Sequence, residues 1–384
     1  MIKTNSMRGY IALMVAHCAG MVDLIALPIW VGTLISRYGF DSQQAGLLAT
    51  LFLAAAVISS LVLASRFQRL NGRWVTTIGF AIAAIAFFAV SRVSDFEIMA
   101  VLHALAGLSA GSALSVTHGT IARSARPHRL FAIVGTALGV FAIVFVGVTP
   151  PLITAVGGSA LFIVFTGVMV VASLVSLFAF PVADAVENDH ERTDGRSRLP
   201  AAVWFGGVGI GCMGLVQAMT FSFLERVGSD RGFSVTSITG VLIALGIVNL
   251  FPAAMAAVLE RRWSAHRVML AGPVLQAVLV VVLMNSMTFA PYAAAAAVFA
   301  AVMIFTHTFA FGLLARLDRS GRALAATPAM LMVGASVGPI LGGTLIKAAG
   351  YGSLGIAAGV IAVLAVFCFS RIPQKSSLAR SELK

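Results

Sequence analysis

Ionisable side chains inside long apolar stretches are the residues of this sequence whose chemistry stands out. Asp23 is the only acid well inside such a stretch, and four histidines share that setting: His17, His103, His118 and His307. A charge in hydrocarbon is costly, so such residues usually face a cavity and carry function. Because an apolar setting favours the neutral acid over the carboxylate, Asp23 can take up and release a proton as its surroundings change. An imidazole in water titrates at about pH 6.5, so we predict proton coupling at Asp23 and His103.

The residues around these groups predict where a solute would bind. Trp30 shares a helical stripe with Asp23 and offers an aromatic face beside small alanines. Gln217 follows Asp23 by 194 residues, an offset at which another motif recurs. The predicted solute site contains Asp23, Trp30, His103, Gln217, His307, Phe305 and Phe309. The structural alternatives are polar groups that hydrogen-bond a neighbouring helix and aromatic rings that face lipid. We favour a structural role for His17 and an interfacial position for His118, which lies little more than one helical turn from Arg123.

The same residues are poorly spaced for metal binding or catalysis. The sequence has no His-x-x-x-His pair, and the neighbours His17 and Cys18 point to different faces of a helix. An enzyme inside the membrane would need clustered ligands or a nucleophile beside a base, and the sequence shows no such cluster. We therefore expect no catalytic residue, no metal site and no cofactor, in a protein that is not an enzyme.

The composition of the chain indicates which kind of structural element positions these residues. Of the 384 residues, 59% are hydrophobic and only 10% are charged, with a mean hydropathy of +0.99. Soluble proteins carry about 25% charged residues, so an ordinary soluble enzyme is excluded. The net charge of +12 does not indicate a nucleic-acid partner, because the basic residues are scattered in short groups between apolar runs.

Twelve apolar stretches are long enough, at roughly 20 residues each, to cross a bilayer as helices. They lack the alternation of a membrane β-barrel, so the predicted fold class is all-α with twelve transmembrane helices. The predicted spans are Ile11–Leu34, Gln44–Ala64, Trp74–Val90, Glu97–Ile121, Phe131–Ile153, Ala160–Ala183, Ala201–Leu224, Val235–Leu259, Val268–Met287, Tyr292–Leu314, Ala325–Ala348 and Ser353–Phe369.

Lys and Arg indicate the orientation of these spans, because cytoplasmic loops are enriched in them. With the N-terminus inside, 21 of the 26 Lys and Arg fall in inside segments and 5 fall outside. Both termini are therefore predicted to be cytoplasmic, in a multi-pass protein of the cytoplasmic (inner) membrane. No Lys or Arg is left at membrane depth, which argues against a strongly anionic solute held by a fixed cation.

The chain divides into two related halves. Basic motifs follow the second and eighth spans at an offset of 194 residues, and the fourth and tenth spans at an offset of 196. A charged stretch separates the sixth span from the seventh. We expect a six-helix bundle over residues 1–183, a cytoplasmic linker over 184–200 and a second six-helix bundle over 201–384, which is an internal repeat typical of transporters.

Two motifs of the first half resemble those of the major facilitator superfamily, and the resemblance extends over essentially the whole chain. Asn71-Gly72-Arg73 resembles the end of the family's loop motif, with Arg69 where an Asp is usual. The fourth span resembles the motif of proton-driven exporters, with His103 at the position usually held by a buried Arg.

The family's glycine-proline pattern is displaced from its usual span. The fifth span carries Gly135-x-x-x-Gly139 without the following Pro, whereas the eleventh span carries the full pattern. Glycine and proline weaken a helix locally, so we predict gating or hinge positions there. These positions are Gly338, Pro339, Gly342 and Gly343 in the eleventh span, with Gly72 and Arg73 in the loop motif.

The resemblance implies two six-helix halves in which spans one, four, seven and ten line a central cavity, and the predicted site residues lie on those spans. We predict a secondary transporter that moves a small organic solute, neutral, zwitterionic, cationic or aromatic, by proton-coupled alternating access. The alternative is a proton-driven exporter of drugs or metabolites, including metal chelates. A sensor without transport is disfavoured by the short termini. The expected partners are the solute, protons and the lipid bilayer, without nucleic acid, and the monomer is expected to be functional.

Overall fold

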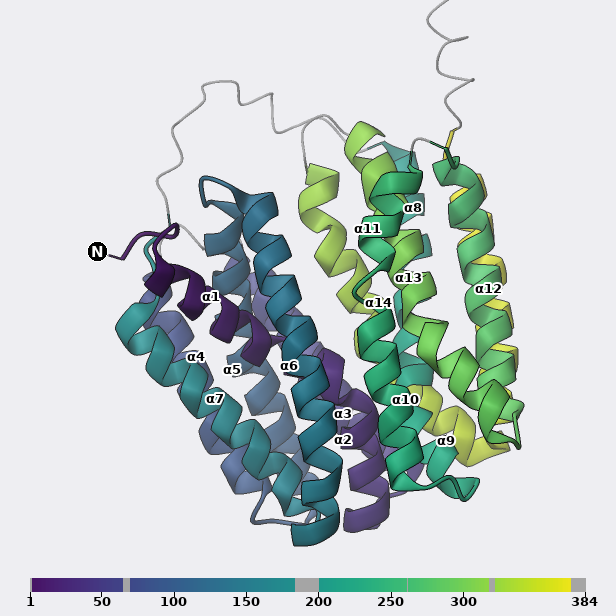
Figure 1. Ribbon diagram of the computed structural model, residues 1–384, viewed down its shortest axis with the longest axis horizontal. Coiled ribbons are helices and arrows are strands. Elements are labelled where there is room, and N and C mark those ends of the chain that lie inside the picture. Colours follow the sequence, from purple (N-terminus) through teal and green to yellow (C-terminus); the bar gives the residue numbers. More distant parts are fainter. Residues whose placement is uncertain (1, 65–69, 184–199, 261, 318–321, 374–384) are drawn as a thin grey trace, which may run out of the picture.

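The computed structural model describes residues 2–64, 70–183, 200–260, 262–317 and 322–373. These residues form fifteen α-helices and no strand (Figure 1). Twelve spans built from them are long and apolar enough to cross a membrane, and each overlaps one predicted span. The prediction of an all-α membrane protein with twelve spans is therefore confirmed.

The helices are numbered along the chain. The first seven are α1 (Met7–Gly20), α2 (Val22–Tyr38), α3 (Ser42–Ala64), α4 (Gly72–Val90), α5 (Phe96–Ala122), α6 (Pro127–Val156) and α7 (Ser159–Ala179). The others are α8 (Ala201–Phe221), α9 (Leu224–Asp230), α10 (Val235–Val248), α11 (Pro252–Leu259), α12 (Ala265–Asn285), α13 (Phe289–Leu317), α14 (Arg322–Ala349) and α15 (Gly352–Ser370). Side chains cap several of them: Asp95, for example, accepts the N–H of Ile98 at 3.0 Å where α5 begins.

Three of the membrane spans are broken helices. The first changes from α1 to α2 at Met21, the seventh from α8 to α9 at residues 222–223, and the eighth from α10 to α11 at residues 249–251. Pro252 begins α11, as expected of a residue that cannot continue a helix. Pro28 and Pro273, which the sequence also marks as interruptions, lie inside the continuous helices α2 and α12.

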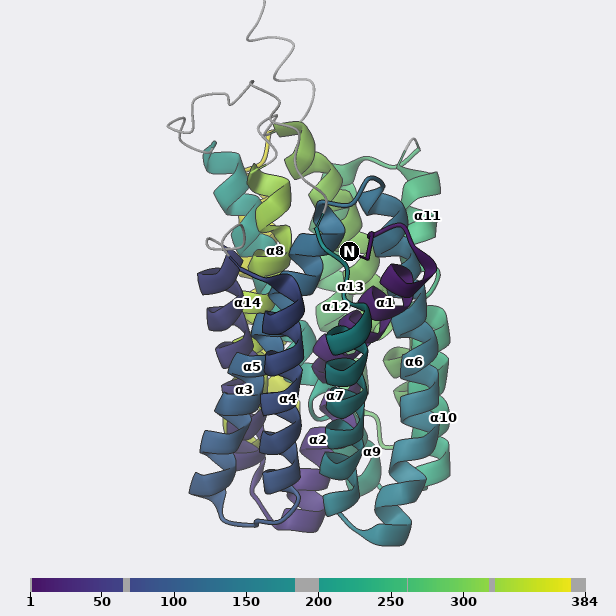
Figure 2. The same ribbon diagram turned by 90° about the vertical axis from the view of Figure 1, so that its left-hand side faces the viewer.

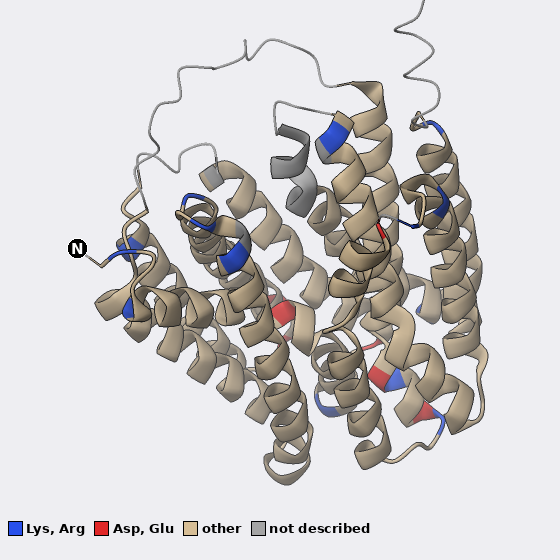
Figure 3. Ribbon diagram, turned by 45° about the horizontal axis from the view of Figure 1, so that its top comes forward, with Lys and Arg blue, Asp and Glu red and all other residues tan. Residues whose placement is uncertain are grey.

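The helices gather in two groups. Figure 1 shows α1–α7 on the left and α8–α15 on the right, and Figure 2 shows the long helices running roughly along one direction. The predicted domain boundaries at 183 and 201 fall between these groups, and the predicted linker lies outside the described residues, which include only Pro200 of it. The charged side chains are few, so almost all of the ribbon in Figure 3 is tan.

A cluster of aromatic rings forms the core of the first group. Trp30 of α2 lies at its centre, and the ring centroids of Phe165, Phe52 and Phe87 are 4.9, 5.2 and 5.9 Å from its own, all edge-on. The His103 ring of α5 completes the cluster at 5.4 Å. Trp30 and His103 are both fully buried. Edge-on aromatic pairs add stability beyond the area that they bury, so this cluster joins α2, α3, α4, α5 and α7.

Replacing the central ring tests this core. Trp30→Phe removes an indole N–H that donates to the His103 imidazole, and it leaves both a cavity and an unpaired buried nitrogen. An unpaired buried acceptor alone lowers stability by about 1–3 kcal/mol. We expect a lower melting temperature in detergent, measured by intrinsic fluorescence or light scattering.

The matched control is Trp204→Phe in α8, because that tryptophan is 64% exposed. It should leave the melting temperature almost unchanged. Equal effects of the two substitutions would show that the Trp30 cluster is not a stabilising core.

Candidate functional site

Asp23 lies at the break in the first span. It is in the first turn of α2, two residues after the non-helical Met21. Its side chain is half-buried and has no side-chain partner among the described residues; the backbone N–H groups of Asp23 and Leu24 are close to it. The first N–H groups of a helix have no partner within the helix, and they favour a negative charge. The break therefore holds a carboxylate without binding it in a permanent ion pair.

Trp30 and His103 contact each other, and both side chains are fully buried. The indole Nε1–H of Trp30 donates to His103 Nε2 at 3.2 Å, and His103 Nδ1 is 2.7 Å from the Met99 carbonyl oxygen. A carbonyl can only accept, so Nδ1 carries the proton and the ring is neutral with both nitrogens bonded. In this structure His103 has no free nitrogen for a solute or a second proton; its coupling role stays a prediction.

Glycines of the fourth span explain how α5 reaches this position. A side chain at Gly107 would overlap the Phe52 carbonyl of α3, and one at Gly111 would overlap the Ala56 backbone. The two helices therefore pack at backbone contact distance, which is a structural use of a small-residue pattern.

Gln217 of α8 is held by a residue that the sequence analysis did not single out. Gln276 of α12 is buried, and its Nε2 donates to Gln217 Oε1 at 3.3 Å and to the Met213 carbonyl at 3.2 Å. Gln217 itself is half-buried. Its amide nitrogen makes no hydrogen bond to another described residue, so Gln217 keeps donors that a solute can use.

His307 and its two flanking phenylalanines lie on different faces of α13. His307 packs on Phe311, with ring centroids 4.9 Å apart. Phe305 instead contacts Phe309 at 5.1 Å and Trp263 at 5.8 Å. Residues two apart on a helix point in nearly opposite directions, so the structure does not bring the phenylalanines to His307.

The structure pairs His17 with His118. His17 Nδ1 and His118 Nε2 are 3.1 Å apart, which joins α1 to α5. The two residues are 101 positions apart in the chain, so no local spacing could have revealed the pair. Among the described residues, no three His, Cys, Asp or Glu side chains converge as metal ligands. The pair satisfies two imidazoles across helices, which is a structural role for His17; for His118 the contact replaces the expected position at the interface.

Glu225 is a second carboxylate at a helix break. It lies in the first turn of α9, as Asp23 lies in the first turn of α2. Its side chain is half-buried and sits so close to Gly32 of α2 that any side chain there would overlap it. The predicted seventh span ends at Leu224, one residue before Glu225, whereas the span in the structure extends to Asp230.

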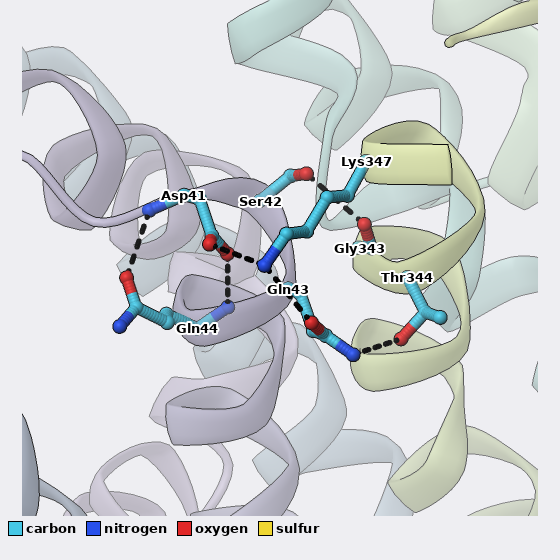
Figure 4. Close-up of polar contacts among 7 residues, drawn as sticks. All are labelled: Asp41, Ser42, Gln43, Gln44, Gly343, Thr344 and Lys347. Carbon is cyan, nitrogen blue, oxygen red and sulfur yellow. Dashed lines mark hydrogen bonds and ion pairs between the residues drawn. The ribbon is translucent and has the colours of Figure 1, made fainter. Parts of the chain in front are cut away.

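The two helix groups are joined where α3 begins and α14 ends (Figure 4). The Ser42 hydroxyl donates to the Gly343 carbonyl at 3.0 Å, and Gln43 Nε2 donates to Thr344 Oγ1 at 3.2 Å. A side chain at Gly343 would overlap the Ser42 carbonyl. We call Asp41, Ser42, Gln43, Gly343, Thr344 and Lys347 the α3–α14 latch.

The latch includes one ion pair. Lys347 Nζ donates to Asp41 Oδ2 at 2.8 Å and to Gln43 Oε1 at 3.2 Å, and the Gln44 N–H donates to Asp41 Oδ1 at 2.8 Å. Partial burial alone would raise the pKa of Asp41, but the hydrogen bonds from Lys347 and from the Gln44 and Gln43 backbone hold it below its ordinary value. The pair is therefore charged at neutral pH.

The predicted hinge residues of the eleventh span are packing positions in this structure. α14 is continuous through Gly338, Pro339 and Gly342. Gly338 faces Ala218 of α8, and Gly342 faces the Met219 carbonyl. The missing side chains let α14 approach α8 closely, which suits a contact on which helices slide. Their role in gating stays a prediction.

The predicted loop-motif residues stay within the first group. Gly72 begins α4 against Phe180 and Val116. Arg73 Nε donates to the Leu177 carbonyl at 2.5 Å, near the end of α7, where cations are favoured. Arg69, which stands where the family usually has an Asp, lies outside the described residues. Arg73 thus joins α4 to α7; its gating role is untested.

Comparisons with known proteins agree with this architecture. The family model described as Major Facilitator Superfamily matches residues 12–317. A bacterial homologue of the human lysosomal transporter Spinster, in an inward-facing and occupied conformation, has a TM-score of 0.73 with 12% identity over 94% of each chain. The nucleoside transporter NupG has a TM-score of 0.70 with 16% identity, over 94% of this chain and 98% of its own. No curated protein matches the sequence.

At these low identities the structural similarity shows a shared fold alone, and the match to the family model establishes the relationship. The match covers most of the chain and includes the breaks in the first, seventh and eighth spans. The family and the fold point to a secondary transporter of small solutes rather than to an enzyme. The chain belongs to the major facilitator superfamily.

Proposed function

We propose that the protein is a proton-coupled secondary transporter of a small organic solute, with Asp23 as the proton-binding residue. The observation that supports this most directly is the position of Asp23 at a helix break, half-buried and without a side-chain partner among the described residues. An ionisable group inside a membrane that no structural pair neutralises is a candidate for function. In the first turn of α2, the Asp23 carboxyl group can be charged when water reaches it and neutral when protein encloses it.

The transport cycle follows from the arrangement of the two groups. In this structure the two helix groups converge on the side of the membrane where the first span ends (Figure 1). The α3–α14 latch lies on that side. The Glu225 contact with Gly32 joins the broken first and seventh spans. Rocking about these contacts would expose Asp23 to one side and then to the other, which is alternating access. Proton binding at Asp23 removes the charge that opposes its enclosure.

The solute is proposed to be neutral, zwitterionic, cationic or aromatic. Lys and Arg are confined to the ends of the spans, so no fixed cation awaits an anionic group in mid-membrane. Gln217 keeps free amide donors, and Asp23 can hold a cationic group. One structural neighbour is a nucleoside transporter, and nucleosides are neutral aromatic solutes, so they are sensible first probes.

The proposed setting is the cytoplasmic membrane with both termini inside, and a monomer that is functional on its own. The bias of Lys and Arg toward one side supports this orientation. Proton-driven export of a drug or metabolite is the alternative direction. It is distinguished by whether inverted vesicles or right-side-out vesicles accumulate the solute.

The proton role of Asp23 is tested by Asp23→Asn. The amide resembles the protonated acid but cannot release a proton. In proteoliposomes with an imposed proton gradient, gradient-driven solute accumulation should fall to the level of protein-free liposomes. Exchange of labelled for unlabelled solute without a gradient should persist, because rocking no longer needs a proton.

Glu97→Gln is the matched control, since Glu97 also lies in the first turn of a helix but is exposed at its end. It should behave as the unmodified protein. Accumulation by Asp23→Asn that follows the gradient normally would contradict the proposal. His103→Gln tests the second candidate for proton coupling: a shifted pH profile of flux would make His103 a proton carrier, whereas lower thermal stability with an unchanged profile would give it a structural role alone.

The latch is tested by removing its ion pair. Asp41→Asn and Lys347→Gln should each shift the protein away from the latched state. Exposed ion pairs contribute about 1 kcal/mol or less, so the shift in population is up to about fivefold. Spin labels at Ser94 and Ser229, which are exposed on the two groups, should report a larger share of long distances.

Glu260→Gln is the control, because Glu260 pairs with Arg316 entirely within the second group.

The pH dependence of the latch follows from the pKa of Asp41. Because the pKa of Asp41 is held below its ordinary value, its ion pair is present above that pKa and is lost only as pH falls through it. The latch should therefore be insensitive to pH between about 5 and 8. A distance distribution unchanged by Asp41→Asn would contradict the role of the latch.

A further inference from the structure

A cavity of about 810 Å³ lies in the second group, between α10, α11, α12 and α13. Its inner wall contains the buried residues Val268, Gly272 and Thr306. Its outer edge contains Phe251 and Leu275, which are 57% and 49% exposed. Because these helices span the membrane, side chains exposed at this depth face lipid. The volume is within the range of ligand sites, about 300–1,000 Å³, and the cavity opens sideways to acyl chains.

One end of the cavity is positively charged. Arg262 and Arg267 line it and are exposed, and neither makes an ion pair with another described residue. The nearby carboxylate of Glu260 is bound to Arg316, so it does not neutralise them. Two guanidinium groups without an ion-pair partner among the described residues, at one end of the cavity, are suited to bind phosphate, to which arginine can donate two parallel hydrogen bonds.

The residues between the two arginines complete an interfacial setting. Trp263 is 52% exposed and packs edge-on against Phe305 at 5.8 Å, so its ring joins the charged end to the apolar wall. Tryptophan is favoured at the boundary between headgroups and hydrocarbon. Ser264 is the N-cap residue of α12, and its side chain makes no capping bond. The first N–H groups of α12 therefore add to the attraction for an anion.

We propose that this cavity binds an anionic glycerophospholipid, with an acyl chain against α11–α13 and the phosphate between Arg262 and Arg267. Charge complementarity selects this occupant. A lipid with a zwitterionic headgroup would bring its own cation toward the arginines, and an apolar solute would leave them unpaired. The site is on the outside of the second group, so it is separate from Asp23 and independent of the proposed transport function.

Native mass spectrometry of the purified full-length protein tests the site. The protein is delipidated and titrated with phosphatidylglycerol and phosphatidylcholine of identical acyl chains. We expect phosphatidylglycerol to bind about thirtyfold more tightly, since each of the two basic residues at a membrane surface contributes about 1 kcal/mol. The double variant Arg262→Gln and Arg267→Gln should remove that preference while retaining weak binding of both lipids.

Two further variants separate the headgroup from the chain. Arg126→Gln with Arg129→Gln removes two exposed arginines where α6 begins and should leave the preference intact. Ala271→Trp fills the cavity while keeping both arginines and should weaken both lipids. Melting temperatures of all variants in detergent confirm that each is folded.

Inorganic phosphate distinguishes a lipid site from a site for free anions. It should not displace phosphatidylglycerol at equal concentration, because it lacks the acyl chains. Equal affinity for the two lipids, an unchanged preference in the Arg262 and Arg267 variant, or displacement by inorganic phosphate would each overturn the proposal.

Discussion

The absence of water in the bilayer interior is the constraint on which the rest of this structure depends. Backbone N–H and C=O groups must pair within helices there, so an irregular backbone is tolerated only where protein or a water-filled cavity surrounds it. The chain departs from helix inside its first, seventh and eighth spans. The first two of these breaks are followed at once by Asp23 and Glu225. The carboxylates thus lie where free N–H groups can favour their charge.

The same constraint explains the other polar groups of the interior. Trp30 with His103, His17 with His118, and Gln217 with Gln276 form hydrogen-bonded pairs between different helices. A buried polar group is costly only when it is unpaired. These pairs therefore fix how the helices of each group pack. Asp23 differs from them because no described side chain pairs with it, and this difference makes it the candidate for a charge that changes during transport.

The contact between the two groups of helices differs from the packing inside each group. Large aromatic rings fill the first group, whereas the α3–α14 latch consists of a few hydrogen bonds and a partly exposed ion pair. Such pairs contribute little and are screened by water. Glycines bring α14 close to α8 and α3 without large interlocking side chains. Apolar side chains of both groups also pack together, with α6 against α10. A change in the relative orientation of the groups, as alternating access requires, must therefore exchange this apolar contact as well as the latch.

Much of the fold could be predicted because each span carries its own signal. A stretch of apolar residues long enough to cross hydrocarbon must become a helix wherever it lies in the chain, so the number, order and approximate ends of the spans followed from composition. The position of Asp23 inside the first span was also evident. The breaks in the first and seventh spans were harder to predict, because no proline stands at Met21 or at residues 222–223.

The partners of the polar side chains were decided only by the tertiary structure. Trp30 and His103 are 73 residues apart, and His17 and His118 are 101 residues apart, so no helical period could predict their contact. Glu225 lay just beyond the predicted end of its span, because the span is longer than hydropathy indicated. The sequence by itself determined which side chains are placed in the membrane, since transfer into hydrocarbon is a property of each segment. Which of them are paired, and which remain free to bind a proton, depends on distances between helices that only packing sets.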